Sequence, residues 1–376
     1  MKIGIIDADL VGRKKHRFPN LACMKLSGYH KQQGHEVSLK LDYKGLGEYD
    51  KIFISKVFLD TEVPTEVLAM PNVEYGGTGF FYDKAPPLPF EIEHQFPDYR
   101  LYDDFIKRQI DDAMAGLEDE DDREDVRRKK QKEFEYYLDY SIGFTTRGCI
   151  RGCSFCVNKN YRFCSKHSPI SEFMDESRKY ICLLDDNVLS CRDWKSIFEE
   201  LNATGKRFQF KQGMDERLLT DEKCEVIFNS KWIGDYIFAF DNIKDRRIVE
   251  KKLDLIREHT DKIPKFYCFC GFNHEAPDTY PAQFWAQDIA DLFERIKILI
   301  NHRCLPYVMR YKDYERSPHR GMYITIARWC NQPSFVKRVT FREFCEKRAD
   351  SKRYMRAFEE SHPEIARLYF DMRWPS

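Results

Sequence analysis

The stretch of sequence that decides the fold reads TRGCIRGCSFC and covers residues 146–156. It places three cysteines, Cys149, Cys153 and Cys156, with three and then two residues between them. A strand-like apolar run, 141–145, comes directly before it. Three thiolates close together on a loop suit a metal ion or an iron–sulfur cluster, because both take soft sulfur ligands. The two glycines of the stretch let the backbone wrap closely around such a group.

The number of local ligands favours a cluster over a zinc ion. Structural zinc sites use four ligands, usually from paired C-x2-C units, whereas the local set here stops at three. A cube-shaped four-iron cluster held by three thiolates keeps one iron open to bind another molecule. A zinc site or an incidental cysteine-rich loop is the alternative interpretation.

The spacing Cys149-x3-Cys153-x2-Cys156, with an aromatic ring at Phe155, resembles the signature of radical S-adenosylmethionine (SAM) enzymes. The resemblance implies that these thiolates hold a [4Fe-4S] cluster whose open iron chelates SAM. It further implies reductive cleavage of SAM to a 5′-deoxyadenosyl radical that abstracts a substrate hydrogen. A one-electron reductant such as flavodoxin or ferredoxin is then a partner. Phe155 packs against the adenine edge of SAM in this interpretation, or else fills the underside of the loop.

The chain on both sides of the cysteines predicts the architecture. From about residue 137, six strand-like runs alternate with helical patterns, which is typical of α/β proteins with parallel strands. Together with the resemblance, this predicts a partial (β/α)6 TIM-like barrel over 137–315, although alternation alone does not distinguish a barrel from an open sheet. Residues 316–376 are helical by pattern and are expected to form a C-terminal cap.

Polar residues follow several of these strand-like runs, at the end where a barrel has its active face. Asp185 and Asp186 can accept hydrogen bonds from the SAM amino group, and Asp-Asp-Asn resembles a motif of relatives with a cobalamin domain; a helix N-cap is the alternative. Arg217 can pair with the SAM carboxylate as a planar fork, or form an ordinary ion pair. By position alone, three more residues are assigned to SAM binding: Asp241, Asn242 and Gly271.

Residues 1–82 predict a small Rossmann-like sheet, and its place before a barrel resembles cobalamin-dependent radical SAM enzymes. The glycine-rich pair Gly76-Gly77 resembles their nucleotide-loop contact. In the motif Asp-x-His-x-x-Gly of base-off cobalamin proteins, the histidine position falls on Asp9. About nine residues separate the second and third strands, which is too short for a helix there. We therefore expect a degenerate domain, with cobalamin as the less favoured cofactor.

Residues 83–136 are expected to form a linker and a charged insertion. The run APPLP at 85–89 is typical of an extended segment. The acidic block 118–122 and the basic block 127–130 follow one another, a pattern that usually marks a solvated helix.

The substrate end is the least specific part of the prediction. Over residues 301–376 there are 16 Lys and Arg against 9 Asp and Glu, which favours an anionic substrate such as a nucleotide or nucleic acid. Cations interleaved with aromatic rings can neutralise phosphates and stack bases, or they can be core residues with snorkelling cations. The candidate substrate residues are Arg310, Tyr311, Lys312, Arg328 and Trp329. No catalytic residue is identified.

Composition sets the class of protein. The chain has 376 residues and equal numbers of basic and acidic residues, which excludes a wholly basic nucleic-acid coat protein. No apolar run approaches the ~20 residues of a membrane span. The odd number of 13 cysteines, with no signal-peptide pattern, predicts reduced thiols in a cytoplasmic protein without a membrane partner. We expect Cys268 and Cys270 to point to opposite faces of a strand, which disfavours a second metal site.

Three functional hypotheses stay open. The first is a radical SAM enzyme that abstracts hydrogen without cobalamin. The second is a cobalamin-dependent radical SAM methyltransferase. The third is a non-enzymatic iron–sulfur protein that senses redox state or binds nucleic acid.

Overall fold

The computed structural model describes residues 1–375 and divides into two compact units. Unit 1 comprises Met1–Gly148, Cys156–Arg162 and Lys166–Leu184. Unit 2 comprises Cys149–Phe155, Phe163–Ser165 and Asp185–Ser376. The division falls inside the range predicted as one barrel.

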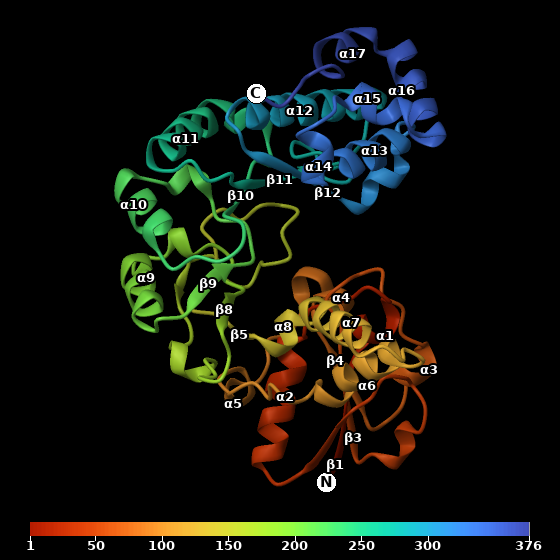
Figure 1. The fold of residues 1–376 in the computed structure, drawn as a ribbon, viewed down its shortest axis with the longest axis vertical. Helices are drawn as coiled ribbons and strands as arrows, with labels where there is room; N and C mark the ends of the chain where they lie inside the picture. The colour runs from red at the N-terminus through yellow and green to blue at the C-terminus, as the bar shows by residue number, and fades with distance from the viewer. Residues whose placement is uncertain (376) are drawn as a thin grey trace. The chain divides into compact units, whose positions relative to one another are not determined.

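Unit 1 begins with a four-stranded parallel sheet (Figure 1). Its strands are β1 (Lys2–Asp7), β2 (Glu36–Leu39), β3 (Lys51–Ser55) and β4 (Val73–Gly76), in the order β2-β1-β3-β4. The isoleucines of β1 and β3 are buried because helices and loops cover both faces. The connecting helices are α1 (Ala8–Gly12), α2 (Leu21–Gln32), α3 (Thr65–Leu68) and α4 (Thr78–Phe81). The predicted Rossmann-like sheet over residues 1–82 is therefore confirmed.

Much of the segment predicted as a linker belongs to the core of unit 1. It forms α5 (Phe90–Glu93), α6 (Asp103–Met114), α7 (Glu120–Glu133) and α8 (Glu135–Leu138). Tyr102, Ile106 and Phe134 join one buried cluster with Ile3 and Ile5 of β1. The linker prediction is thus wrong for these residues, because their aromatic and apolar side chains complete the core beside the sheet.

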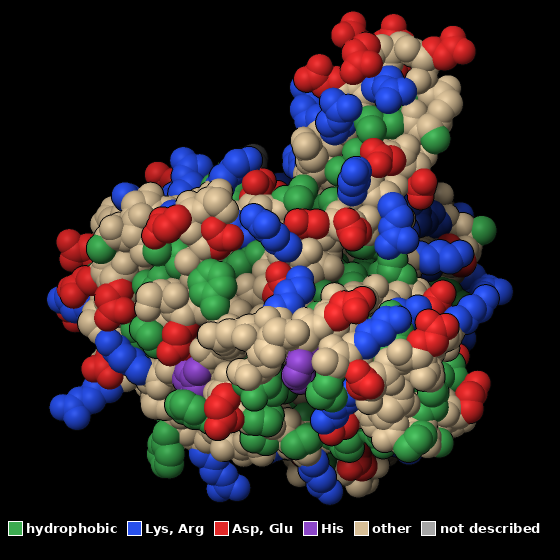
Figure 2. Space-filling view, turned by 90° about the horizontal axis from the view of Figure 1, so that it is seen from below, with side chains coloured by type: hydrophobic (Ala, Val, Ile, Leu, Met, Phe, Trp, Pro, Cys, Tyr) green, Lys and Arg blue, Asp and Glu red, His purple; other side chains and the backbone are tan. Residues whose placement is uncertain are grey.

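The charged insertion within that segment has the predicted character. Helix α7 has no buried residue, and Asp119 caps its N-terminus by accepting a hydrogen bond from the Asp122 amide. Acidic residues occupy its first turn and lysines its last, which suits the helix dipole. Figure 2 shows a charged projection with Asp and Glu at its tip and Lys and Arg below it.

Further strands alternate with helices as the sequence predicts. In unit 1, β5 (Tyr140–Gly143) pairs in parallel with β8 (Tyr180–Leu183). In unit 2, β10 (Ile237–Ala239), β11 (Lys265–Cys270) and β12 (Leu305–Arg310) form a parallel sheet. The remaining strands are β6 (Thr146–Arg147), β7 (Ser165–Lys166) and β9 (Arg207–Phe210). The α/β class with parallel sheets is confirmed, whereas closure into a partial barrel stays a prediction.

The helices of unit 2 follow the same alternation (Figure 1). They are α9 (Trp194–Ala203), α10 (Asp221–Asn229), α11 (Arg246–His259) and α12 (Ala282–Asn301). Helix α12 packs on β11 and β12 and carries the buried Arg295. One Arg295 nitrogen, Nη1, donates to the carbonyls of Phe240, Asp241 and Phe269, at 2.8, 3.1 and 2.9 Å. This buried cation thus ties together the carboxyl ends of β10 and β11.

One prediction about β11 is wrong. Cys268 and Cys270 lie two residues apart, and side chains alternate with a period of two along a strand, so both point to the same face. The burial of alternate residues along β11 agrees, with both thiols buried. Burial raises the pKa of Cys268 to about 12 and that of Cys270 well above its usual range. These thiols therefore stay protonated and pack as small apolar groups.

The C-terminal region is helical, as predicted. It consists of α13 (Arg320–Cys330), α14 (Pro333–Val336), α15 (Phe341–Glu346), α16 (Ala349–Ser361) and α17 (Pro363–Tyr369). Buried aromatic rings of Trp329, Phe341 and Phe370 hold these helices together. Helix α13 packs on β12 of the sheet. Among the described helices, none has the length and apolar character that crossing a bilayer requires.

Candidate cluster and cofactor site

The three motif cysteines differ from most other cysteines in exposure. Cys149, Cys153, Cys156 and Cys164 are half-exposed, whereas the remaining nine are buried. Gly148 and Gly152 have φ angles of 103° and 58°, conformations that favour glycine. Over residues 1–375, no three His, Cys, Asp or Glu side chains are grouped for holding a metal ion. The donor set itself, three accessible thiols on a loop turned by glycines, fits the thiolate chemistry of an iron–sulfur cluster.

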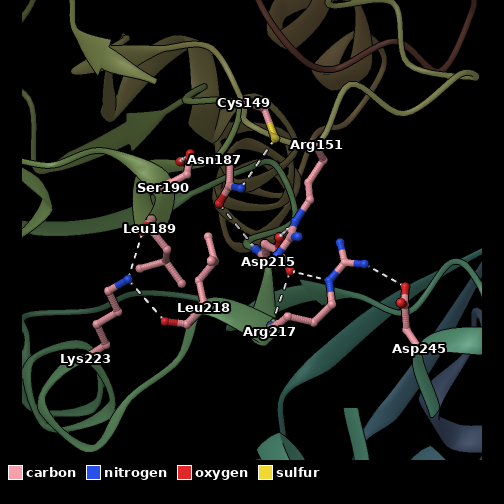
Figure 3. Close-up of polar contacts among 10 residues, drawn as sticks. All are labelled: Cys149, Arg151, Asn187, Leu189, Ser190, Asp215, Arg217, Leu218, Lys223 and Asp245. Carbon is pink, nitrogen blue, oxygen red and sulfur yellow. Dashed lines mark hydrogen bonds and ion pairs between the residues drawn. The ribbon is translucent and has the colours of Figure 1, made fainter. Parts of the chain in front are cut away.

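Asn187 joins the first cysteine to the loop after β9 (Figure 3). Its Nδ2 donates to Cys149 Sγ at 3.4 Å, and its Oδ1 accepts from the Asp215 amide at 3.4 Å. The residue is 3% exposed, so this amide is held in the interior of unit 2. A donor aimed at sulfur favours the thiolate form that a cluster requires. The sequence interpretation passed over Asn187, although it ends the stretch Leu-Leu-Asp-Asp-Asn.

Asp215 is the centre of a charged network in the same loop (Figure 3). Its Oδ2 accepts from Arg151 Nε of the cysteine stretch. Its Oδ1 accepts from the Arg217 amide at 3.2 Å and from Arg217 Nε at 2.7 Å. Arg217 Nη1 donates to Asp245 Oδ2 at 2.6 Å. The cysteine stretch is thereby fastened to the loop after β9 by a nearly buried carboxylate.

These contacts bear on the role predicted for Arg217. Burial opposes its charge, but the hydrogen bond and charge of Asp215 outweigh that effect and raise its pKa. The guanidinium thus stays charged between two carboxylates, as in the ion-pair alternative. Its pairing with a SAM carboxylate stays a prediction.

Glu216 is a further polar residue that the sequence interpretation did not assign. Its side chain is buried, and its Oε2 has no hydrogen-bond partner in the structure. Burial, reinforced by the charge of Asp215, raises the pKa of this carboxyl well above its usual range. Burial therefore favours the protonated form of the Glu216 carboxyl. A buried acid with an unused oxygen is a candidate for ligand contact.

The two acids predicted to bind the SAM amino group lie directly after β8. Asp185 is buried and Asp186 is half-buried. The short helix that follows, η4 (Val188–Ser190), has Asn187 at its N-cap position. Neither aspartate therefore caps a helix, and their role as acceptors for an ammonium group stays a prediction.

Asp241 and Asn242 lie at the carboxyl end of β10. Asp241 Oδ1 accepts from the Phe269 amide at 3.0 Å, and burial, opposed by the charge of Arg295, raises its pKa to about 6. Asn242 caps η6 (Ile243–Asp245) by accepting from the Lys244 amide at 3.0 Å. Both side chains thus have structural partners, and their contact with SAM stays a prediction.

Gly271, predicted to let the backbone approach adenine, has a reason of its own to be glycine. Its φ is 78°, and a Cβ there would lie 2.9 Å from the Tyr314 Cβ. The group that closely approaches Gly271 is thus Tyr314 of unit 2.

We expect Gly271→Ala to destabilise the protein by more than the ~1 kcal/mol that a left-handed backbone costs a non-glycine residue. Gly205 is a matched control, because its φ is 77° and its nearest outside atom is the flexible Lys231 Nζ at 3.9 Å. Urea unfolding of the two variants measures the difference. Equal losses would show that Tyr314 does not constrain residue 271.

Phe155 lies in an aromatic cluster at the carboxyl end of β11. Its ring stacks on Phe269 with centroids 4.2 Å apart and contacts Phe272 and His274 edge-on at 5.7 and 5.6 Å. Tyr311, a predicted substrate residue, contacts Phe269 and Phe272 at 5.8 and 5.0 Å. The structure therefore brings Phe155 and Tyr311 into one apolar cluster.

The other predicted substrate residues are not gathered into one site. Arg310 lies over the Tyr314 ring at 4.6 Å, and Lys312 is exposed near Tyr311. Arg328 pairs with Asp350 at 2.8 Å. Trp329 is 0% exposed and donates from Nε1 to the Val339 carbonyl at 3.0 Å. The prediction for Trp329 is corrected, because a core residue has no surface to offer a substrate.

Several cations of the C-terminal region form ion pairs with acids of the same region. Arg342 pairs with Glu359 and Asp371, and Lys352 and Arg356 both pair with Glu346. These pairs do not change the surplus of cations over residues 301–376, because their acids are already among the 9 counted.

A second charged cluster, in unit 1, holds the chain just before the cysteines. Glu93 Oε1 accepts from Lys25 Nζ at 3.1 Å and from Arg147 Nη2 at 3.2 Å. Burial would raise the pKa of Glu93, but the charges of Lys25 and Arg147 outweigh it and hold the pKa below 4.5. Arg147 lies two residues before Cys149, so this cluster fixes the start of the cysteine stretch.

We expect Glu93→Gln to cost about 2 kcal/mol of stability at pH 7, because Lys25 is buried and loses its charged partner. A carboxyl whose pKa is lowered on folding stabilises the protein above its unfolded pKa and loses this contribution as pH falls through its folded value. The gap between wild type and variant should therefore shrink below about pH 4.5. Glu74→Gln, which breaks the exposed pair with Lys51, is the control and should cost under ~1 kcal/mol. A pH-independent gap would contradict the assignment.

The carboxyl edge of the unit 1 sheet tests the fit of cobalamin. Gly77 and Gly79 pack on the segment after β3: an added Cβ would lie 2.3 Å from the Lys56 carbonyl oxygen and 2.8 Å from that of Phe58. Asp9 is buried and accepts from the Val57 amide at 2.7 Å and from the Thr61 hydroxyl at 2.5 Å. The glycines and the aspartate thus serve internal packing. These contacts give no support for a corrin cradle at this edge, and cobalamin stays the less favoured cofactor.

Comparisons with known proteins bear on the fold. No protein-family model and no curated protein matches the sequence. Radical SAM methyltransferase TsrM from Kitasatospora setae, solved with cobalamin and a [4Fe-4S] cluster, aligns over 82% of this chain and 74% of its own at 12% identity, with a TM-score of 0.50. Its complex with tryptophan and aza-SAM covers 82% and 72% at 12% identity, with a TM-score of 0.49. The cobalamin-dependent SAM radical enzyme OxsB aligns over 98% and 56% at 11% identity, with a TM-score of 0.36. This chain therefore shares the fold of the radical SAM methyltransferase TsrM.

Proposed function

We propose that this protein is a radical SAM enzyme whose cluster is held by Cys149, Cys153 and Cys156. The observation that carries the proposal is the set of three half-exposed thiols on a glycine-turned loop. The fold shared with TsrM supports it, because that protein binds a [4Fe-4S] cluster and the analogue aza-SAM. When bound, the cluster and SAM would supply a 5′-deoxyadenosyl radical for hydrogen abstraction from a substrate that we propose to be anionic.

The side chains of the chain have supporting roles in this proposal. Asn187 donates to Cys149 Sγ and favours its thiolate form. The network of Arg151, Asp215 and Arg217 keeps the cysteine stretch in place. Asp185 and Asp186 supply acceptors for the SAM ammonium group. The Phe155 cluster excludes water from its side of the site.

Cobalamin is not part of the proposed function. TsrM binds it, but the carboxyl edge of the unit 1 sheet uses its glycines and Asp9 for internal packing. The alternatives of a cobalamin-dependent methyltransferase and of a non-enzymatic iron–sulfur protein therefore lack a supporting observation in the described residues. An external one-electron donor is required, and its identity is left open.

The test is anaerobic reconstitution with iron and sulfide, followed by addition of dithionite and SAM. We expect about four iron atoms per chain, as three thiolates on a four-iron cluster require, and release of 5′-deoxyadenosine measured by mass spectrometry. Uptake of zinc with no four-iron cluster would overturn the proposal. Corrinoid added to the same sample should leave the absorbance of the free corrinoid unchanged.

A further inference from the structure

A pocket of about 430 Å³ opens in unit 1, away from the cysteine stretch in sequence. It is lined by Gly12, Arg13, Lys15, His16, Arg17, Phe58 and Asp60. Its two walls are the segments after α1 and after β3. In open parallel sheets, ligands bind beyond the carboxyl ends of the strands. The second segment begins at the end of β3, and the first follows β1 after the short helix α1.

The pocket is positively charged. Arg13, Lys14, Lys15 and Arg17 stand within five residues. Two acids offset them: Asp60 pairs with Arg13 at 2.6 Å, and Glu133 pairs with Arg17. Lys15 lines the pocket, is exposed and forms no ion pair among residues 1–375. Among the lining residues, Lys15 thus remains for an anion, and the exposed Lys14 precedes it in the chain.

The opposite wall is flat and apolar. Phe58 is 41% exposed, and the Arg13 guanidinium lies over its ring at 4.2 Å. The His16 ring meets Phe58 edge-on at 6.0 Å. Val57 and Leu59, on either side of it, are 51% and 50% exposed. An exposed aromatic ring beside cations is the arrangement on which proteins stack nucleobases.

This wall is held in place before any ligand arrives. Asp9 accepts from the amides of Val57 and Phe58, at 2.7 and 3.4 Å, and from the Thr61 hydroxyl. The Lys56 Nζ donates to the Thr61 carbonyl at 2.9 Å. The loop after β3 is therefore ordered before binding, which lowers the entropy that binding costs.

We propose that this pocket binds a nucleotide, its phosphate against Lys15 and Arg13 and its base against Phe58. The nucleotide is either a free mononucleotide or one unit of a single-stranded nucleic acid. Both offer the same phosphate and base. The site lies within unit 1 and uses none of the cysteines. It therefore stands independently of the proposed function, and it assigns a ligand class to the carboxyl edge of the unit 1 sheet.

The test measures binding to the full-length protein without SAM. The probes are adenosine 5′-monophosphate (AMP), inorganic phosphate and a short fluorescein-labelled single-stranded RNA. Calorimetry measures binding of the two small probes, and fluorescence anisotropy measures binding of the RNA. The variants are Lys14→Glu/Lys15→Glu and Phe58→Ala, all exposed residues. Lys44→Glu/Lys107→Glu makes the same charge change at exposed lysines of unit 1 outside the pocket.

We expect the Lys14/Lys15 variant to weaken nucleotide binding roughly tenfold. It should also lower the slope of log affinity against log salt concentration by about 1. The Lys44/Lys107 variant should change affinity less than twofold. Phe58→Ala should weaken AMP or RNA but not phosphate. Binding of AMP identifies a free nucleotide as the source, and binding of RNA alone identifies a strand. No binding of either, equal losses in both lysine variants, or phosphate binding as tight as AMP would overturn the proposal.

Discussion

Replacing Cys149, Cys153 and Cys156 together by alanine should abolish iron uptake and the formation of 5′-deoxyadenosine. Each thiolate is one of only three protein ligands available to a four-iron cluster in this stretch, so none can be replaced by a neighbour. The single variants should therefore each lose most of the cluster. Iron content and the visible absorbance of the reconstituted protein measure this directly, without dependence on substrate.

Cys164→Ala is the matched control for this experiment. Cys164 is the other half-exposed cysteine of the described chain and lies outside the three-cysteine spacing. The proposed function requires the Cys164 variant to bind iron as the wild type does. If its loss of iron equals that of a motif variant, the cluster ligands are assigned wrongly. Circular dichroism separates loss of the cluster from loss of the fold, since all three motif cysteines are at least partly exposed.

Replacing Asp215 by asparagine should destabilise the protein by about 3 kcal/mol, the usual cost of removing one partner from a buried ion pair. The Asp215 side chain is 6% exposed and receives hydrogen bonds from both Arg151 and Arg217. Asparagine keeps the shape but leaves two guanidinium groups without their shared counter-charge. Because Arg151 belongs to the cysteine stretch, we also expect weaker retention of the cluster. Urea unfolding and iron content measure the two effects.

Asp245→Asn is the control for the Asp215 variant. Asp245 binds the outer end of the same network, at Arg217 Nη1, and its side chain is 35% exposed. Solvent screens such a pair, so the expected cost is under ~1 kcal/mol and the cluster should be retained. Equal losses in the two variants would show that Asp215 is not the centre of the network.

Strand, helix and cysteine spacing could be predicted well because each depends on neighbours in the chain. Apolar patterning predicted the small sheet in residues 1–82 and the alternation of strands with helices from about residue 137. The charge blocks predicted the solvated helix α7 for the same reason. The segment 83–136 was misjudged because its prolines and charges are visible locally, whereas the burial of Tyr102 and Phe134 depends on the distant β1.

Contacts in the candidate site were also beyond prediction from local sequence. The sequence named Arg217 but not the carboxylates that hold it, since Asp245 lies 28 residues further along the chain. It assigned Trp329 to substrate because aromatic and basic residues alternate there, and burial against Val339 is a property of packed helices. Asn187 stands 38 residues from Cys149, and no local pattern predicts that contact.

By itself the sequence determined the three-cysteine spacing, the alternation of strands and helices, and the charged character of residues 118–130, because these are properties of adjacent residues. The tertiary structure alone decided that Asn187 and Asp215 support the cysteine stretch, that Gly77 and Gly79 pack on Lys56, and that a basic pocket opens beside Phe58. The physical reason is that hydrogen bonds, ion pairs and cavities form between residues that folding brings together, and chain spacing carries no record of those distances.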